Sequence, residues 1–132
     1  MNKTFPFAYI RKKICKIENA VVPIQAKAIQ YGIGCFSGIR GFWNPKKKNL
    51  YLFRPKDHFE RLEEGAKILG MQLELNFEKF QKNLFELLNK NKVKEVVYIR
   101  PTLYSGSTQL TPRFDNEDDD LAIYMISLKE YF

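Results

Sequence analysis

Features typical of membrane-spanning, secreted and metal-binding proteins are missing from this sequence of 132 residues. No apolar run approaches the roughly 20 residues of a membrane-spanning helix, and residues 1–6 lack the apolar core of a signal peptide. The two cysteines, Cys15 and Cys35, have no metal-ligand spacing and are too few for a disulfide framework. We therefore expect a cytoplasmic protein with reduced thiols, without a metal site and without a membrane partner.

Positive charge is in excess: the sequence has 22 lysine and arginine residues against 15 aspartate and glutamate residues, which gives a formal net charge of +7. Such an excess would suit a nucleic-acid partner. The basic residues are spread along the chain, however, and residues 115–120 are strongly acidic. We therefore interpret the lysines as a solvated surface and predict no nucleic-acid partner. A basic nucleic-acid binder stays open as an alternative that salt-dependent binding to DNA or RNA would reveal.

Apolar residues make up 45% of the chain and aromatic residues 14%, which is enough to bury the core of one domain. Runs of apolar residues, alternating or continuous, predict the strands, which we place at 5–17 (as a hairpin), 39–43, 49–53, 95–104 and 121–127. The polar residues 105–120 predict a loop between the last two strands.

Two helices are predicted between these strands. Pro55 suits the first position of a helix and Gly70 suits its end, and the residues between them give one apolar stripe of Phe59, Leu62, Ala66 and Leu69. Asn76 suits the cap of a second helix over 77–89. We predict an α+β fold, a mainly antiparallel sheet with the two helices packed on one face.

Four glycines fall within ten residues at positions 32, 34, 38 and 41, a pattern that indicates a backbone passing close to something else. Residues 31–40 (YGIGCFSGIR) resemble the YGxGxFEGIR signature of fold type IV aminotransferases, which depend on pyridoxal 5′-phosphate (PLP). Residues 52–62 resemble the LFRxxxHxxRL motif of that family, and residues 66–69 match its AKIL. Residues 98–101 resemble the YIRP strand that is typical of the branched-chain amino-acid aminotransferases.

The resemblance implies a role for individual side chains. Arg61 corresponds to the arginine that binds the 5′-phosphate of the cofactor, and a guanidinium suits phosphate because it offers a planar, permanently charged fork. The residues implied to bind substrate are Tyr31, Phe36, Gly38, Arg40, Tyr98, Arg100 and Tyr131. Without the resemblance, Arg61 would be interpreted as an exposed helix residue, Phe36 and Tyr98 as core aromatics, and Arg100 as the partner of a surface acid.

The implied activity is transfer of an amino group between branched-chain amino acids and 2-oxoglutarate, with 2-oxo acids as the other substrates. In this family the Schiff-base lysine lies in a C-terminal domain, and no lysine here stands in a matching motif. We therefore expect residues 1–132 to be the N-terminal small domain, inactive alone, whose partners are that C-terminal domain and further copies of the chain in a homo-oligomer such as a dimer. No catalytic residue is assigned within the chain.

Some residues depart from the family pattern and leave the substrate open. Ser37 replaces the glutamate of FEGIR, and Leu128 stands where branched-chain enzymes often have tryptophan. A D-amino-acid aminotransferase and an aminodeoxychorismate lyase remain alternatives within the same fold. A module that only dimerises or binds a ligand remains an alternative outside the enzymes. His58 is expected to support packing near Arg61, since the sequence reveals no Asp or Cys partner for it.

Overall fold

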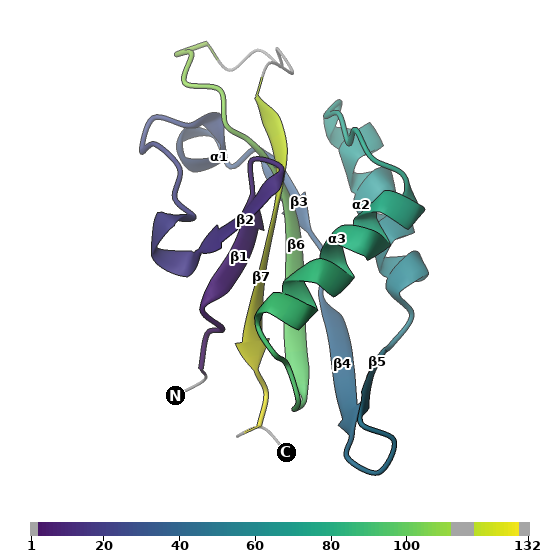
Figure 1. Cartoon of the computed structure of the whole chain (residues 1–132). Coiled ribbons are helices and arrows are strands. Elements are labelled where there is room, and N and C mark those ends of the chain that lie inside the picture. Colours follow the sequence, from purple (N-terminus) through teal and green to yellow (C-terminus); the bar gives the residue numbers. More distant parts are fainter. Residues whose placement is uncertain (1–2, 112–117, 130–132) are drawn as a thin grey trace.

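The computed structural model describes residues 3–111 and 118–129, and within these ranges it shows one antiparallel sheet with two long helices on one face (Figure 1). The strands are β1 (Phe7–Ile10), β2 (Lys13–Lys16), β3 (Gly34–Phe36), β4 (Ile39–Asn44), β5 (Asn49–Leu52), β6 (Val97–Ser105) and β7 (Asp119–Ser127). The helices are η1 (Ile17–Asn19), α1 (Lys27–Gln30), α2 (Pro55–Leu69) and α3 (Phe77–Lys90). The strands follow one another across the sheet in the order β2-β1-β7-β6-β4-β5, and β3 pairs with β6 beside this path.

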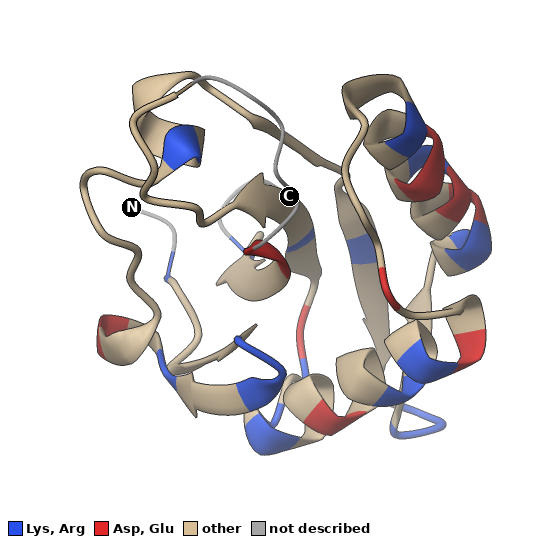
Figure 2. Ribbon diagram, turned by 90° about the horizontal axis from the view of Figure 1, so that it is seen from above, with Lys and Arg blue, Asp and Glu red and all other residues tan. Residues whose placement is uncertain are grey.

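Residues of β6 point alternately to the two faces of the sheet, of which one is packed against helices and the other is open. Val97, Ile99 and Leu103 are at most 1% exposed and belong to the core under α2 and α3, whereas Tyr98 and Arg100 are only half-buried. Alternate residues of a strand point to opposite faces of a sheet. The helices therefore cover one face, as Figure 2 also shows from above, and Tyr98 and Arg100 belong to the other.

The two long helices form where the sequence predicts them. Pro55 occupies the first turn of α2, and Gly70 ends the helix with a φ of 68°, a left-handed conformation that glycine adopts without steric cost. The side chain of Asn76 caps α3 by accepting a hydrogen bond of 2.9 Å from the backbone N–H of Lys79. The apolar stripes of both helices, which include Phe59, Leu62, Ala66, Phe80 and Leu84, are buried against the sheet. None of the helices in the described ranges is long and apolar enough to cross a membrane.

The predicted α+β fold is confirmed, but the predicted loop over 105–120 is wrong at both of its ends. Ser105 pairs with Asp119 and Tyr104 pairs with Asp120, so β6 and β7 extend into residues interpreted as loop. The physical reason is that ladder hydrogen bonds and a hydrogen bond of 2.9 Å from the Tyr104 hydroxyl to Asp120 outweigh the low strand propensity of aspartate.

Helix α1 is an element that the sequence does not predict. Its four residues carry no side-chain cap, so no local signal marks where it begins. A tertiary contact fixes it instead, because the backbone N–H of Lys27 donates to the carbonyl of Ser107 at 2.8 Å and Ala26 is fully buried. This short helix leads directly into the glycine-rich stretch.

Candidate functional site

Five of the predicted site residues gather on the open face of the sheet. Antiparallel pairing sets Arg40 of β4 opposite Tyr98 of β6, while β3 sets Phe36 opposite Thr102 of the same strand. Directly paired residues project to the same face, and Arg100 lies between Tyr98 and Thr102 in the alternation of β6. Gly38 lies in the short break between β3 and β4, so these neighbouring segments present all five positions together.

Arg100 is held between two aromatic rings. Its Cζ lies 4.2 Å from the centre of the Phe36 ring and 5.2 Å from that of Tyr98. Its Nε and Nη2 both donate to the Tyr98 hydroxyl, at 3.2 Å and 2.9 Å. This hydrogen bond is the largest cause that raises the pKa of Arg100. Among the described residues, Arg100 is therefore held by aromatic neighbours and not by a surface acid, and Phe36, 54% exposed, is not a core residue.

Gly38 is required by the position of Tyr98. A β-carbon at residue 38 would lie 2.7 Å from Cε2 and 2.8 Å from Cζ of the Tyr98 ring, closer than carbon atoms approach in folded proteins. The space left by the missing side chain is thus filled by the tyrosine itself. The glycine lets Tyr98 lie across the break between β3 and β4, where its hydroxyl reaches Arg100.

A groove with a volume of about 470 Å³ runs beside these residues, and it is lined by Gly38, Arg40, Phe42, Phe53 and His58. Phe42 is 43% exposed and Phe53 58% exposed, so the groove has an apolar floor that is open to solvent. Arg40 supplies a positive charge. Within the described residues Arg40 has no hydrogen-bond or ion-pair partner for its side chain. The groove can therefore take a ligand with both an apolar part and an anionic part.

His58 joins α2 to the glycine-rich segment. Its Nδ1 lies 2.8 Å from the Oγ of Ser37, which is only 2% exposed. Burial is the largest cause that lowers the pKa of His58, followed by the positive charge of Arg61, while Asp57 acts in the opposite direction. No partner for His58 is evident from the sequence. The contact with Ser37 depends on how α2 docks on the sheet, so no local sequence pattern could reveal it.

Arg61 lies one turn after His58 on the exposed side of α2. Within the described residues its guanidinium has no ion-pair partner, although it contributes to the electrostatic environment of His58. An exposed arginine without an ion-pair partner in the described chain, one turn from the groove residue His58, is chemically suited to bind a phosphate. Its predicted role in phosphate binding stays a prediction.

The remaining two predicted residues are not joined to this group. The Tyr31 hydroxyl donates to the carbonyl of Leu110, and no hydrogen bond or ring contact in the described chain connects Tyr31 with Phe36, Tyr98 or Arg100. Tyr131 lies outside the described residues. The described chain also contains no group of three or more His, Cys, Asp or Glu side chains that could hold a metal ion.

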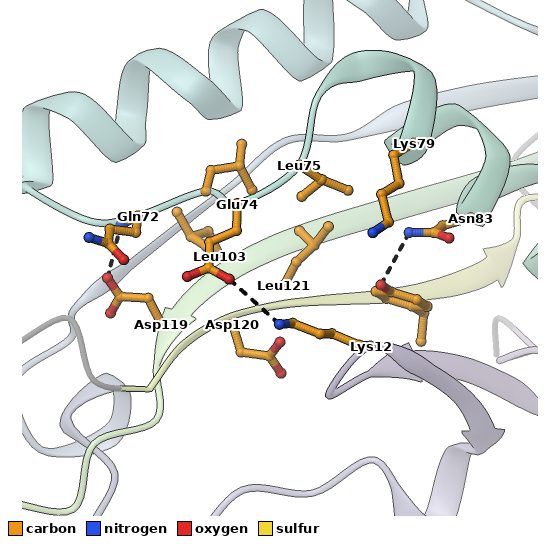
Figure 3. A pocket seen from close by; sticks show the side chains of 12 residues that line it. Lys12, Gln72, Glu74, Leu75, Lys79, Asn83, Leu103, Asp119, Asp120 and Leu121 are labelled. Atoms are coloured by element: carbon orange, nitrogen blue, oxygen red, sulfur yellow. Dashed lines mark hydrogen bonds and ion pairs between the residues drawn. The ribbon is translucent and has the colours of Figure 1, made fainter.

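A second cavity, of about 190 Å³, lies on the helix-covered side between the β1–β2 hairpin, the start of β7 and α3 (Figure 3). Its polar groups bind one another: Asn83 donates to the Tyr9 hydroxyl at 3.1 Å, and Lys12 lies 3.5 Å from Glu74. These contacts close the seam between the hairpin and the helices. None of the predicted site residues lines this cavity.

The chain belongs to the class IV aminotransferase family, because the family model for amino-transferase class IV matches residues 34–131. A probable branched-chain-amino-acid aminotransferase of Aquifex aeolicus (strain VF5) is 35% identical over 125 residues, which are 95% of this chain and 40% of that protein. The predicted family is thereby confirmed.

Two solved structures of branched-chain aminotransferases resemble the chain. That of Thermoproteus uzoniensis with norvaline has a TM-score of 0.86 and 33% identity, and the match covers 95% of this chain and 41% of that one. That of Thermobaculum terrenum in its PLP form has a TM-score of 0.80 and 24% identity, and the match covers 92% of this chain and 40% of that one. At this identity the likeness is one of fold alone. The chain thus spans about two fifths of the length of its relatives.

Proposed function

We propose that this chain is the substrate-side and phosphate-binding domain of a branched-chain amino-acid aminotransferase. The whole protein would transfer amino groups between branched-chain amino acids and 2-oxoglutarate. The observation that carries the proposal is the guanidinium of Arg100 held over Phe36 and beside Tyr98, on the same open face as Arg40. The names of the relatives from Aquifex aeolicus and Thermoproteus uzoniensis support the branched-chain substrate class.

The open face offers both environments that such a reaction needs. Phe36 and the groove residues Phe42 and Phe53 supply apolar surface for an aliphatic side chain. Arg40 and Arg100 supply positive charge for the distal carboxylate of glutamate. Because Arg100 is already fixed by Tyr98, little side-chain entropy is lost when a carboxylate binds it. The open face can therefore accept an aliphatic and an acidic substrate in turn.

Pyridoxal 5′-phosphate would be held through its phosphate by Arg61, and when bound it supplies the electron-withdrawing ring on which the amino group is exchanged. The resemblance of residues 52–62 to the family motif, together with the match to amino-transferase class IV, supports this cofactor class. The groove beside Arg61 is lined by no lysine of the described chain. The reactive amine would therefore come from the additional length that the relatives have, and residues 1–132 alone would be inactive.

We place the whole protein in the cytoplasm as a homo-oligomer. The free thiols of Cys15 and Cys35 support a reducing compartment. Exposed apolar side chains near the glycine-rich stretch support a protein partner on that side of the molecule. These side chains are Val21, Ile24, Ile29 and Leu110.

A chimera tests the proposed function. Residues 1–132 would replace the matching segment of the Aquifex aeolicus relative, and amino-group transfer from leucine to 2-oxoglutarate would be measured. We expect activity from the chimera and none from the 132-residue chain with pyridoxal 5′-phosphate. Activity with D-alanine in place of leucine, or cleavage of aminodeoxychorismate, would assign the chain to another branch of the family. A folded chimera without any of these activities would contradict the proposal.

In the same chimera, Arg61→Ala should weaken cofactor retention roughly ten- to hundredfold, the loss expected for a charge-assisted contact to phosphate. The measurement is the cofactor's dissociation constant from absorbance during dialysis. Lys67→Ala is the matched control, because Lys67 is also an exposed cation on α2. Equal cofactor affinity in the Arg61→Ala variant and the control would remove Arg61 from the site.

A further inference from the structure

Ser37 has a buried hydroxyl with one neighbour that can accept its proton. The residue is 2% exposed, and its backbone N–H is fixed by donating to the carbonyl of Pro101 at 3.1 Å. Its Oγ lies 2.8 Å from Nδ1 of His58, and no other described residue forms a hydrogen bond with this oxygen. The hydroxyl is therefore cut off from solvent and depends on the imidazole.

This geometry selects one tautomer of His58. A buried hydroxyl that does not donate its proton leaves a polar group unsatisfied, which is strongly unfavourable. If His58 carried its proton on Nδ1, it would donate to Ser37 and the serine proton would have no acceptor. If Ser37 donates instead, Nδ1 is the acceptor and the ring proton resides on Nε2. The second arrangement satisfies both groups.

The charges around His58 favour a neutral ring and an anionic ligand. Arg40 lines the groove with His58, and Arg61 follows it by one turn of α2; neither arginine has an ion-pair partner in the described chain. Arg54 and Asp57, the other charged groups that act on the ring, pair with each other. The lowered pKa of His58 agrees with a neutral imidazole. A neutral ring adds a hydrogen-bond donor to the groove without adding a third positive charge.

We infer that Ser37 positions His58, and that His58 donates a hydrogen bond from Nε2 to an oxyanion bound in the groove beside Arg40. His58 is the residue that contacts the ligand, and Ser37 acts through it. The hydrogen bond between Ser37 and His58 is argued from the geometry alone. The assignment of the oxyanion to a cofactor or a substrate rests on the proposed function. The oxyanion is either a phosphate or a carboxylate, since Nε2–H and guanidinium groups bind both.

Nitrogen-15 NMR tests the tautomer directly, because His58 is the only histidine in the sequence. The 132-residue chain would be labelled and its imidazole resonances followed from neutral to acidic pH. We expect the pattern of a neutral ring protonated on Nε2 at neutral pH. A ring protonated on Nδ1, or one already charged at neutral pH, would overturn the inference.

Titration with oxyanions tests the ligand, with sodium chloride at the same ionic strength as the control. The probes are inorganic phosphate, pyridoxamine 5′-phosphate, which carries no aldehyde to condense with lysines, and glutarate. A shift of the Nε2 resonance with the two phosphates assigns the cofactor's phosphate as the partner. A shift with glutarate alone assigns a substrate carboxylate. If none of the three shifts Nε2 beyond sodium chloride, the oxyanion role is wrong.

Ser37→Ala tests the positioning role. We expect the ring to populate both tautomers and to bind the active oxyanion roughly fivefold more weakly, the effect of about one hydrogen bond. Ser127→Ala is the matched control, because Ser127 is also buried and its Oγ donates to another side chain, that of Glu95. An unchanged tautomer in the Ser37→Ala variant would overturn the role of Ser37. This readout needs no turnover, so it can fail independently of the proposed function.

Discussion

At position 38 a side chain from the neighbouring strand occupies the volume that any residue other than glycine would need. Tyr98 lies against the backbone there, and the same tyrosine holds Arg100 through its hydroxyl. The glycine therefore controls the position of two larger side chains, although it contributes no polar or charged group of its own.

Gly38→Ala should destabilise the fold by about 1–3 kcal/mol, the usual cost of inserting an atom into a packed contact. The new β-carbon would push the Tyr98 ring away and weaken its hydrogen bonds to Arg100. Urea denaturation of the 132-residue chain measures the change in the free energy of unfolding. The control is the same substitution in a Tyr98→Ala background, where the clash is gone. An equal cost in both backgrounds would show that the tyrosine is not what excludes a side chain at 38.

The sequence allowed part of this site to be predicted. The motifs and the alternation of β6 from Val97 to Leu103 allowed five residues to be grouped, namely Phe36, Gly38, Arg40, Tyr98 and Arg100. The contact between Ser37 and His58 could not be predicted, since it joins residues 21 positions apart through the docking of a helix. Tyr31 was grouped with the others from the motif alone, and its hydroxyl instead binds the carbonyl of Leu110.

At the scale of elements, periodicity and caps located both long helices and most strands. Apolar spacing and the end signals at Pro55, Gly70 and Asn76 are local, so they can be read without knowing the fold. The extension of β7 to Asp119 depends on its partner strand, and α1 depends on Ser107, so neither has a local signal. Elements such as α1, which have no local signal and are held only by long-range contacts, are the ones that sequence patterns miss.

Asn76→Ala should lower the free energy of unfolding by about 1 kcal/mol, the usual contribution of a helix N-cap. The substitution removes the side-chain oxygen that accepts from the backbone N–H of Lys79, leaving that donor without its cap. Thermal denaturation followed by circular dichroism measures the effect. Asn76→Ser keeps an oxygen at the cap and is expected to retain most of the stability. A Ser variant as unstable as the Ala variant would argue against capping as the cause.

At the scale of the whole molecule, Tyr104 links three parts of the sheet. It is 8% exposed on β6, its hydroxyl donates to Asp120 on β7, and the same carboxylate accepts from the backbone N–H of Arg11 in the β1–β2 turn. Burial, followed by the hydrogen bond to Asp120, raises the pKa of Tyr104 well above its usual value. The neutral phenol therefore belongs to the folded state.

We expect the free energy of unfolding to fall above about pH 10, the ordinary pKa of tyrosine. Above that pH the unfolded chain loses the Tyr104 proton while the folded chain keeps it, so each pH unit costs up to about 1.4 kcal/mol. Tyr9, whose pKa is raised chiefly by burial, acts in the same direction. Urea denaturation at several pH values should show a shallower decline for Tyr104→Phe. The exposed Tyr51→Phe is the control, and an identical slope for Tyr104→Phe and wild type would contradict this account.

The alternation of β6 from Val97 to Leu103 also makes the protein adaptable. Residues 98, 100 and 102 can be randomised together in a library without altering Val97, Ile99 or Leu103, which hold the sheet to the helices. Variants drawn from such a library should keep the parent's folding yield. A lineage could therefore diversify the open face along one strand while its structural scaffold stays unchanged.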